Sequence, residues 1–152
     1  MSSIIGDFTD VVFEQITSLG GAVFYAIVTL FTLFIGELWL FISLALTFVL
    51  IMAVSLTIKM FFFKERPDKK RYKNIIEKLD ASSFPSIHSA KITALATILS
   101  YYVGGIWVTA LLGVTALLVS YSRIYLNRHY FSDVIGGIVL GGIVAVAVII
   151  LV

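Results

Sequence analysis

The chain has 152 residues, of which 60% are hydrophobic and 13% charged, and its mean hydropathy is +1.06. This composition excludes an ordinary soluble domain and indicates an integral membrane protein. The net charge of +2 is too small to argue for a nucleic-acid partner, and the absence of cysteine excludes disulfides, thiolate metal sites and a cysteine nucleophile. A transmembrane helix needs about 20 apolar residues, so we expect a single membrane-embedded domain, residues 1–152.

Residues 1–19 are predicted to form an amphipathic helix, because apolar residues recur at intervals of three and four with acidic residues between them. The apolar positions are Ile5, Phe8, Val12, Ile16 and Leu19, and the acidic ones are Asp7, Asp10 and Glu14. We expect this helix to lie in the membrane interface or to pack against the rest of the bundle.

Five apolar stretches follow, each bounded by glycines or charged residues. They run from Ala22 to Ile35, Leu38 to about Phe63, Ser86 to about Val103, Ile106 to about Leu126, and about Ser132 to Val152. The predicted fold is therefore an all-α integral membrane protein, a bundle of about five transmembrane helices preceded by the amphipathic helix. Gly137 and Gly141 stand four apart in the last stretch, a spacing that lets helices approach closely in lipid.

The one extended polar segment, residues 64–84, holds seven basic and four acidic side chains and must lie outside the hydrocarbon. We expect one or two surface helical turns from Asn74 to Leu79. With five spans, this loop and the polar stretch 122–133 emerge on the same side of the membrane. Lys59 and Arg66, the segment 82–90 and the stretch 122–133 should therefore meet at one surface.

The chemistry expected at this surface is phosphate binding. Lysine and arginine are suited to hold a phosphate, arginine through its two-pronged donor fork. The helix that starts near Ser86, Ile87 and His88 would aim backbone N–H groups and the positive end of its dipole at the same anion. Three cations, Lys59, Arg66 and Arg123, would stabilise charge on the phosphate oxygens during a displacement reaction.

Two histidines beside a phosphate site suggest that one imidazole attacks phosphorus while the other protonates the leaving oxygen. His129 is the better nucleophile candidate, because Asp133 stands four residues away and can accept a hydrogen bond from one ring nitrogen. His88, at a helix start, is left as the general acid. Two histidines and an aspartate could also bind a metal, but the surrounding cations argue against this.

These residues form three motifs that resemble the signature of the type 2 phosphatidic acid phosphatase (PAP2) superfamily of membrane lipid phosphatases. The motifs are Lys59 with six residues before Arg66-Pro67, then Pro85-Ser86-Ile87-His88, then Ser122-Arg123 with five residues before His129 and three more before Asp133. Ile87 stands where the family usually has glycine. Members often have six spans, whereas this chain has room for five and the amphipathic helix.

The resemblance implies a metal-independent phosphatase, without cofactor, that forms a phosphohistidine and acts on a polyprenyl diphosphate or a phosphatidate-type lipid entering from the bilayer. By position, it implies that His129 is the nucleophile, Asp133 its partner and His88 the proton donor. The phosphate-binding positions would be Lys59, Arg66, Ser86, Ile87 and Arg123.

Other interpretations stay open at this stage. The alternatives are a small transporter of phosphorylated solutes and a non-enzymatic membrane bundle, although the chain shows no internal repeat of the kind transporters have. Lys91 could either snorkel to the interface or assist the site, while Arg128 is expected to contact lipid headgroups or solvent. The excess of basic residues favours a cytoplasmic active face, whereas the family habit favours an extracytoplasmic one. The oligomeric state is not determined by the sequence.

Overall fold

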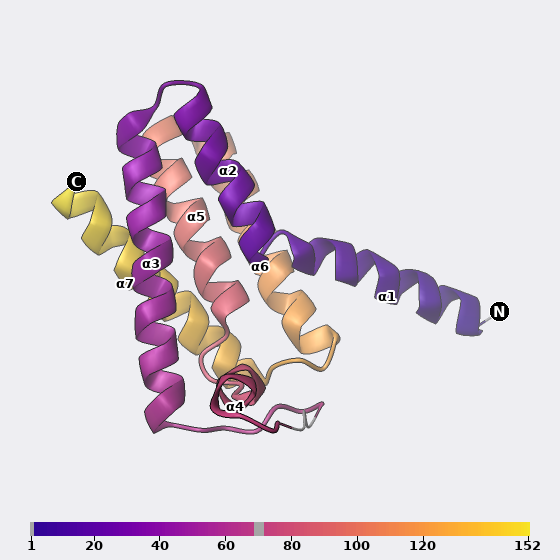
Figure 1. Ribbon diagram of the computed structural model, residues 1–152. Coiled ribbons are helices and arrows are strands. Elements are labelled where there is room, and N and C mark those ends of the chain that lie inside the picture. Colours follow the sequence, from indigo (N-terminus) through magenta and orange to yellow (C-terminus); the bar gives the residue numbers. More distant parts are fainter. Residues whose placement is uncertain (1, 69–71) are drawn as a thin grey trace.

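The computed structural model describes residues 2–68 and 72–152, and these residues form seven α-helices (Figure 1). The helices are α1 (Ser2–Ser18), α2 (Ala22–Phe34), α3 (Leu38–Phe61), α4 (Ile75–Ala81), α5 (Ile87–Val103), α6 (Ile106–Tyr125) and α7 (Phe131–Leu151). Every helix predicted from the hydropathy pattern is present with ends within two residues of those expected. The surface turns predicted near Asn74 are α4. Within the polar loop 64–84, residues 69–71 lie outside the described part.

Within the part of the chain that the structure describes, three helices are long and apolar enough to cross a membrane, namely α3, α6 and α7. Together, α1 and α2 could supply a fourth crossing as a pair bent by 43° at the break between them. The all-α membrane architecture is therefore confirmed. The number of five spans stays a prediction, since α2 and α5 have only 13 and 17 residues.

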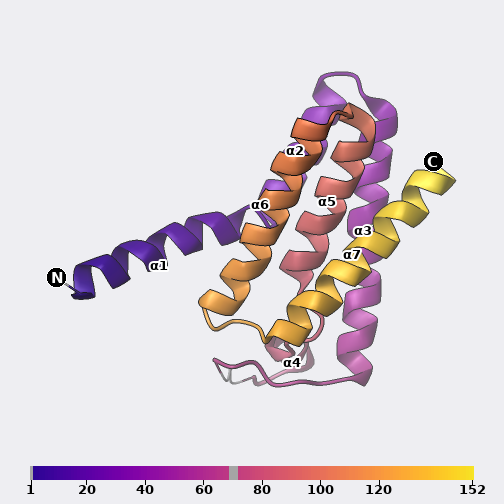
Figure 2. The same ribbon diagram turned by 180° about the vertical axis from the view of Figure 1, so that it is seen from behind.

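Helix α5 is the central element of the bundle, and it packs against α7, α6 and α3 (Figures 1 and 2). The close approach of α5 and α7 depends on small residues at the contact. A methyl group added to Gly141 would collide with the carbonyl oxygen of Ala90, and one added to Gly137 with that of Ser86. The predicted role of these two glycines is confirmed, and their contact holds the start of α5 against the N-terminal half of α7.

Helix α1 projects sideways from the bundle instead of running along it (Figure 1). It is attached to α6 by aromatic contacts, with the rings of Phe13 and Tyr125 stacked at 4.1 Å and Thr9 hydrogen-bonded to the Tyr125 hydroxyl. The acidic residues Asp7, Asp10 and Glu14 are exposed. The contacts to α6 come from Thr9 and Phe13, whereas Phe8 and Val12 of the predicted apolar face are exposed, so the apolar pattern does not mark the face that packs on α6.

The polar loop after α3 folds back on itself, so that the segments before and after α4 lie side by side. Glu65 and Ser82 form a short antiparallel bridge. The backbone N–H of Ser83 donates to the carbonyl of Lys64 at 2.7 Å, and the Ser83 hydroxyl donates to the carbonyl of Glu65. This pairing holds Arg66 near the start of α5.

Candidate active site

A cavity of about 760 Å³ opens at the end of the bundle near α4, and all three polar segments contribute to its wall. Residues of the six helices α1 to α6, of the loop after α3 and of the loop after α6 line it. The basic residues and histidines in its lining are Lys59, Arg66, His88, Lys91, Arg123, Arg128 and His129. The predicted convergence of the three segments is what the structure shows. The structure adds Lys91 and Arg128 to the cations expected there.

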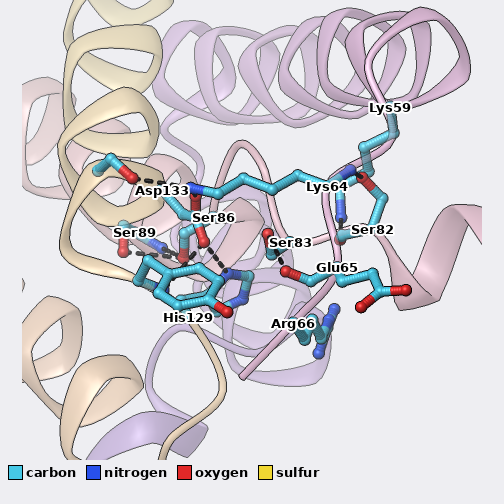
Figure 3. A network of polar contacts seen from close by, with 12 residues as sticks. Lys59, Lys64, Glu65, Arg66, Ser82, Ser83, Ser86, Ser89, His129 and Asp133 are labelled. Atoms are coloured by element: carbon cyan, nitrogen blue, oxygen red, sulfur yellow. Dashed lines mark hydrogen bonds and ion pairs between the residues drawn. The ribbon is translucent and has the colours of Figure 1, made fainter. Parts of the chain in front are cut away.

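Lys59, at the end of α3, and Arg66, in the loop after α3, both line the cavity. Lys59 lies in the last turn of α3 and is buried, and its ammonium donates to the carbonyl oxygen of Ser82 at 2.5 Å (Figure 3). Arg66 is also buried, with one terminal nitrogen 3.8 Å from the carboxylate of Asp80 and its Nε without a partner among the described residues. The guanidinium therefore retains donor capacity toward an anion.

Arg123 is placed by the last turn of α6. Its Nη1 donates to the hydroxyl of Thr17 on α1 at 2.8 Å, and its Nε has no partner in the described part of the chain. Thr17 and Glu14 also line the cavity. The N-terminal helix is therefore part of the wall of the site, a role that its amphipathic pattern did not reveal.

At the N-terminus of α5, the residues of the second motif differ in whether they line the cavity. Ile87 and His88 line the cavity. Ser86 is fully buried, and its hydroxyl accepts hydrogen bonds from the backbone N–H and the hydroxyl of Ser89 (Figure 3). Its own N–H donates to the carbonyl of Asp133 at 2.9 Å. Ser86 thus caps α5 and ties it to α7, and its hydroxyl is not part of the cavity lining.

His129 lies in the turn between α6 and α7, and its backbone N–H donates to the carbonyl of Arg123. Only 3% of the residue is exposed. Burial, together with the charges of Arg66, Arg123 and Lys59, lowers the pKa of His129 from 6.5 to about 3. The ring is therefore neutral at physiological pH, the state that a nucleophile requires.

Asp133 has stronger partners than the histidine predicted for it. One carboxylate oxygen lies 2.5 Å from the ammonium of Lys64, and the other accepts from the backbone N–H of Tyr130 at 2.9 Å (Figure 3). The Nδ1 atom of His129 is 3.8 Å from this second oxygen and has no hydrogen-bond partner among the described residues. The two side chains face each other at a distance too long for a hydrogen bond.

Lys64, the ion-pair partner of Asp133, is a residue that the sequence did not single out, and it lines a separate pocket beside α3 instead of the cavity. It also donates to the hydroxyl of Ser132 at 2.8 Å and lies over the ring of Tyr130. It occupies one of the six variable positions between Lys59 and Arg66, in a segment rich in basic residues, so no local signal distinguished it. Arg128, expected to contact solvent or lipid, is partly exposed and also pairs with Asp68 at 3.1 Å.

The opposite part of the cavity wall is apolar. Phe48, Met52 and Leu56 follow one another at four-residue intervals along α3 and end at Lys59. From Phe48 to Lys59 this stripe extends roughly 16 Å along the helix axis.

No grouping of three or more His, Asp or Glu side chains that could hold a metal ion occurs in residues 2–68 and 72–152.

The fold and the cavity together define an all-α membrane protein with a cationic, histidine-containing site at one end of its bundle. Comparison with known proteins identifies the family. The sequence model of the PAP2 superfamily matches residues 36–152. The chain belongs to the PAP2 superfamily.

Two solved structures share this fold over most of their length. LpxE from Aquifex aeolicus is 28% identical, with a TM-score of 0.80 over 93% of this chain and 86% of that one. A transmembrane PAP2-type phosphatidylglycerolphosphate phosphatase from Bacillus subtilis is 26% identical, with a TM-score of 0.77 over 95% of this chain and 76% of that one. A search of curated protein sequences found no match.

Proposed function

We propose that this protein is a membrane lipid phosphatase that removes a phosphate from a lipid phosphomonoester or a lipid diphosphate. The observation that carries this proposal is the cavity, in which basic residues and two histidines from three separate segments adjoin an apolar wall. The cationic end matches a phosphate, and the stripe along α3 matches a lipid tail. Membership in the PAP2 superfamily and the phosphatidylglycerolphosphate phosphatase among its structural neighbours support the same class of reaction.

In the first step of the proposed reaction, His129 attacks the phosphorus atom. Because Nδ1 faces Asp133, Nε2 is the nitrogen that forms the new bond to phosphorus. The bond from phosphorus to the leaving oxygen breaks, its electron pair goes to that oxygen, and His88 supplies the proton. Lys59, Arg66 and Arg123 stabilise the charge on the remaining phosphate oxygens.

In the second step, water attacks the phosphohistidine and inorganic phosphate is released, with His88 accepting the proton of the water. Asp133 is proposed to orient His129 and to stabilise its ring while the phosphate is attached. This requires the 3.8 Å separation between Nδ1 and the Asp133 carboxylate to shorten when substrate binds, as catalytic hydrogen bonds commonly do. Ser86 is proposed to serve phosphate binding through the start of α5, which it caps.

We also propose that the reaction needs no metal ion, because fixed cations in the wall supply the charge stabilisation that a metal would otherwise provide. A transporter would place its ionisable groups near the middle of the membrane, often between repeated halves. Here the basic side chains gather at one end of the bundle. The phosphatase is therefore the better account of the site.

The membrane arrangement that fits this function has five crossings, by α2, α3, α5, α6 and α7, with α1 in the interface. Helix α5 is shorter than usual for a crossing, but it lies inside the bundle and needs little contact with lipid. With this arrangement the substrate enters the cavity from the adjoining leaflet. The charge bias of the loops favours a cytoplasmic site.

The proposal is tested with purified protein in detergent. We expect it to release inorganic phosphate from a prenyl diphosphate, phosphatidate or phosphatidylglycerol phosphate with EDTA present. His129→Ala should lower kcat by at least about 1,000-fold and abolish an acid-labile phosphoenzyme. His88→Ala should slow its formation. Strict dependence on added magnesium would refute the metal-free mechanism, and a phosphoenzyme trapped in His129→Ala would refute the assignment of the nucleophile.

A further inference from the structure

Lys91 differs from every other cation in the cavity wall in lacking a polar partner. It lies one turn into α5, only 3% of it is exposed, and it lines the cavity. Its ammonium lies 5.9 Å from the ring centroid of Phe48. Within residues 2–68 and 72–152, it makes no hydrogen bond and no ion pair. By contrast, Lys59, Arg66, Arg123 and Arg128 each contact a carbonyl, a carboxylate or a hydroxyl.

An ammonium enclosed in a protein cavity without a hydrogen-bond acceptor is less well solvated than in bulk water and has gained no anion in exchange. Contact with the face of Phe48, near the distance limit for a cation–π interaction, offsets only part of this cost. The low exposure of Lys91 also excludes the alternative that its ammonium snorkels to the interface. The ammonium therefore lines the cavity as a donor available to an anionic ligand.

The position of Lys91 indicates which part of a ligand it would meet. His88 lies one turn closer to the end of the bundle, and Phe48 begins the apolar stripe that continues through Met52 and Leu56. Lys91 thus lies farther into the bundle than His88, beside Phe48 at the end of the apolar stripe that is remote from Lys59. An anion held there would lie farther into the cavity than a phosphate held by Lys59.

We propose that Lys91 binds a second phosphate of the substrate, located farther into the cavity than the scissile phosphate, and thereby selects lipids that carry two phosphates. This inference rests on the proposed function. For a lipid diphosphate, His129 forms its bond to the terminal phosphorus and the bond to the bridging oxygen breaks. The leaving group is then the lipid monophosphate, whose added negative charge Lys91 stabilises. For a lipid with two separate phosphates, the inner phosphodiester takes the same place.

The test compares matched pairs of substrates that differ in the inner phosphate. One pair is farnesyl diphosphate and farnesyl monophosphate, and the other is phosphatidylglycerol phosphate and phosphatidate. For wild type, Lys91→Met and Lys91→Arg, kcat/KM is measured on all four in detergent. We expect Lys91→Met to lower the ratio of kcat/KM between the two-phosphate and one-phosphate member of at least one pair by about tenfold or more. Lys91→Arg should restore part of it.

The matched control is Lys78→Met. Lys78 also lies over an aromatic ring, at 5.5 Å from Phe63, but it is exposed and does not line the cavity. Its substitution should leave both ratios unchanged. The pair whose ratio falls in Lys91→Met identifies which spacing of phosphates the site accepts.

An equal loss on both members of both pairs, or no change in either ratio, would overturn the proposal for Lys91. In that case, release of phosphate from any of the four lipids by wild-type protein would still support the phosphatase function. Failure of wild type to release phosphate from any of the four lipids would instead count against the proposed function.

Discussion

At the scale of single residues, the most informative contact is the one that Asp133 makes with Lys64. The sequence suggested that Asp133 serves His129, yet the carboxylate is paired with Lys64 and with the backbone of Tyr130. Asp133 therefore has two roles that can be separated. One is structural, at the start of α7, and the other is the proposed orientation of the nucleophile.

Substitution of Asp133 and Lys64 should separate these roles. Asp133→Asn keeps an oxygen for the Tyr130 N–H but cannot stabilise a charged His129 ring, so we expect kcat to fall roughly 100-fold. Lys64→Met leaves the carboxylate in place and should lower kcat by less than about tenfold. Steady-state kinetics on the same lipid measure both. Equal losses in the two variants would mean that Asp133 acts through the structure alone.

The low pKa of His129 predicts a dependence of stability on pH. The unfolded chain takes up a proton on this histidine near pH 6.5, whereas the folded protein does so only near pH 3. The free energy of unfolding should therefore fall as the pH is lowered from about 6.5 toward 3. In His129→Gln this contribution is absent, so its melting temperature in detergent should drop less than that of wild type between pH 7 and pH 4.5. A parallel decline in both proteins would contradict the assignment.

At the scale of elements, α5 and α7 pack closely because glycines leave no side chain between their backbones at the contact. Gly137 and Gly141 meet backbone carbonyls at the start of α5, and the Ser86 N–H donates to the carbonyl of Asp133. The same contact positions His88 relative to His129. Packing of these two helices is therefore part of the geometry of the site.

Gly141→Ala should loosen this contact, because its methyl group has no room against Ala90. We expect a loss of about 1–3 kcal/mol in stability, seen as a lower melting temperature in detergent, together with reduced activity. Gly142→Ala is the matched control, since nothing lies within 4 Å of the added carbon. It should leave stability nearly unchanged or slightly raised, because alanine favours helix. A similar loss in both variants would argue against a specific α5–α7 contact.

At the scale of the whole molecule, α4 lies at one end of the bundle and the α2–α3 turn at the other (Figure 1). The charged residues of the cavity lie at the α4 end. Trp39 and Trp107 begin α3 and α6 at the other end, and both are exposed. Indoles favour the headgroup level of a membrane. The two ends of the molecule thus differ chemically: one carries the basic residues and histidines of the cavity, and the other carries the exposed tryptophans.

The chain contains no cysteine, so single-cysteine variants can report the membrane arrangement directly. We expect Lys73→Cys and Glu37→Cys to react with an impermeant thiol reagent from opposite sides of the membrane. If α1 lies in the interface, Asp10→Cys should react from the same side as Lys73→Cys. Protection of Asp10→Cys, or reaction from the side of Glu37→Cys, would instead favour α1 and α2 as one broken span.

The sequence by itself determined the helices and the segments of the site. Hydropathy is a local property, so the ends of α3, α6 and α7 could be predicted closely. The order of polar segments predicted that His88 and His129 would lie at one surface of the bundle. Three motifs with fixed spacing were sufficient to indicate the family.

Only the tertiary structure decided which partners the site residues have. The rotation of each helix and the path of the loop after α3 depend on contacts between distant segments, which no local pattern records. For this reason the pairing of Lys64 with Asp133, the inward position of Ser86 and the contribution of Thr17 to the wall were not predicted. The same applies to Lys91, whose two interpretations were equal in the sequence. The packing of α3 against α5 places its ammonium in the cavity beside Phe48 and away from the interface.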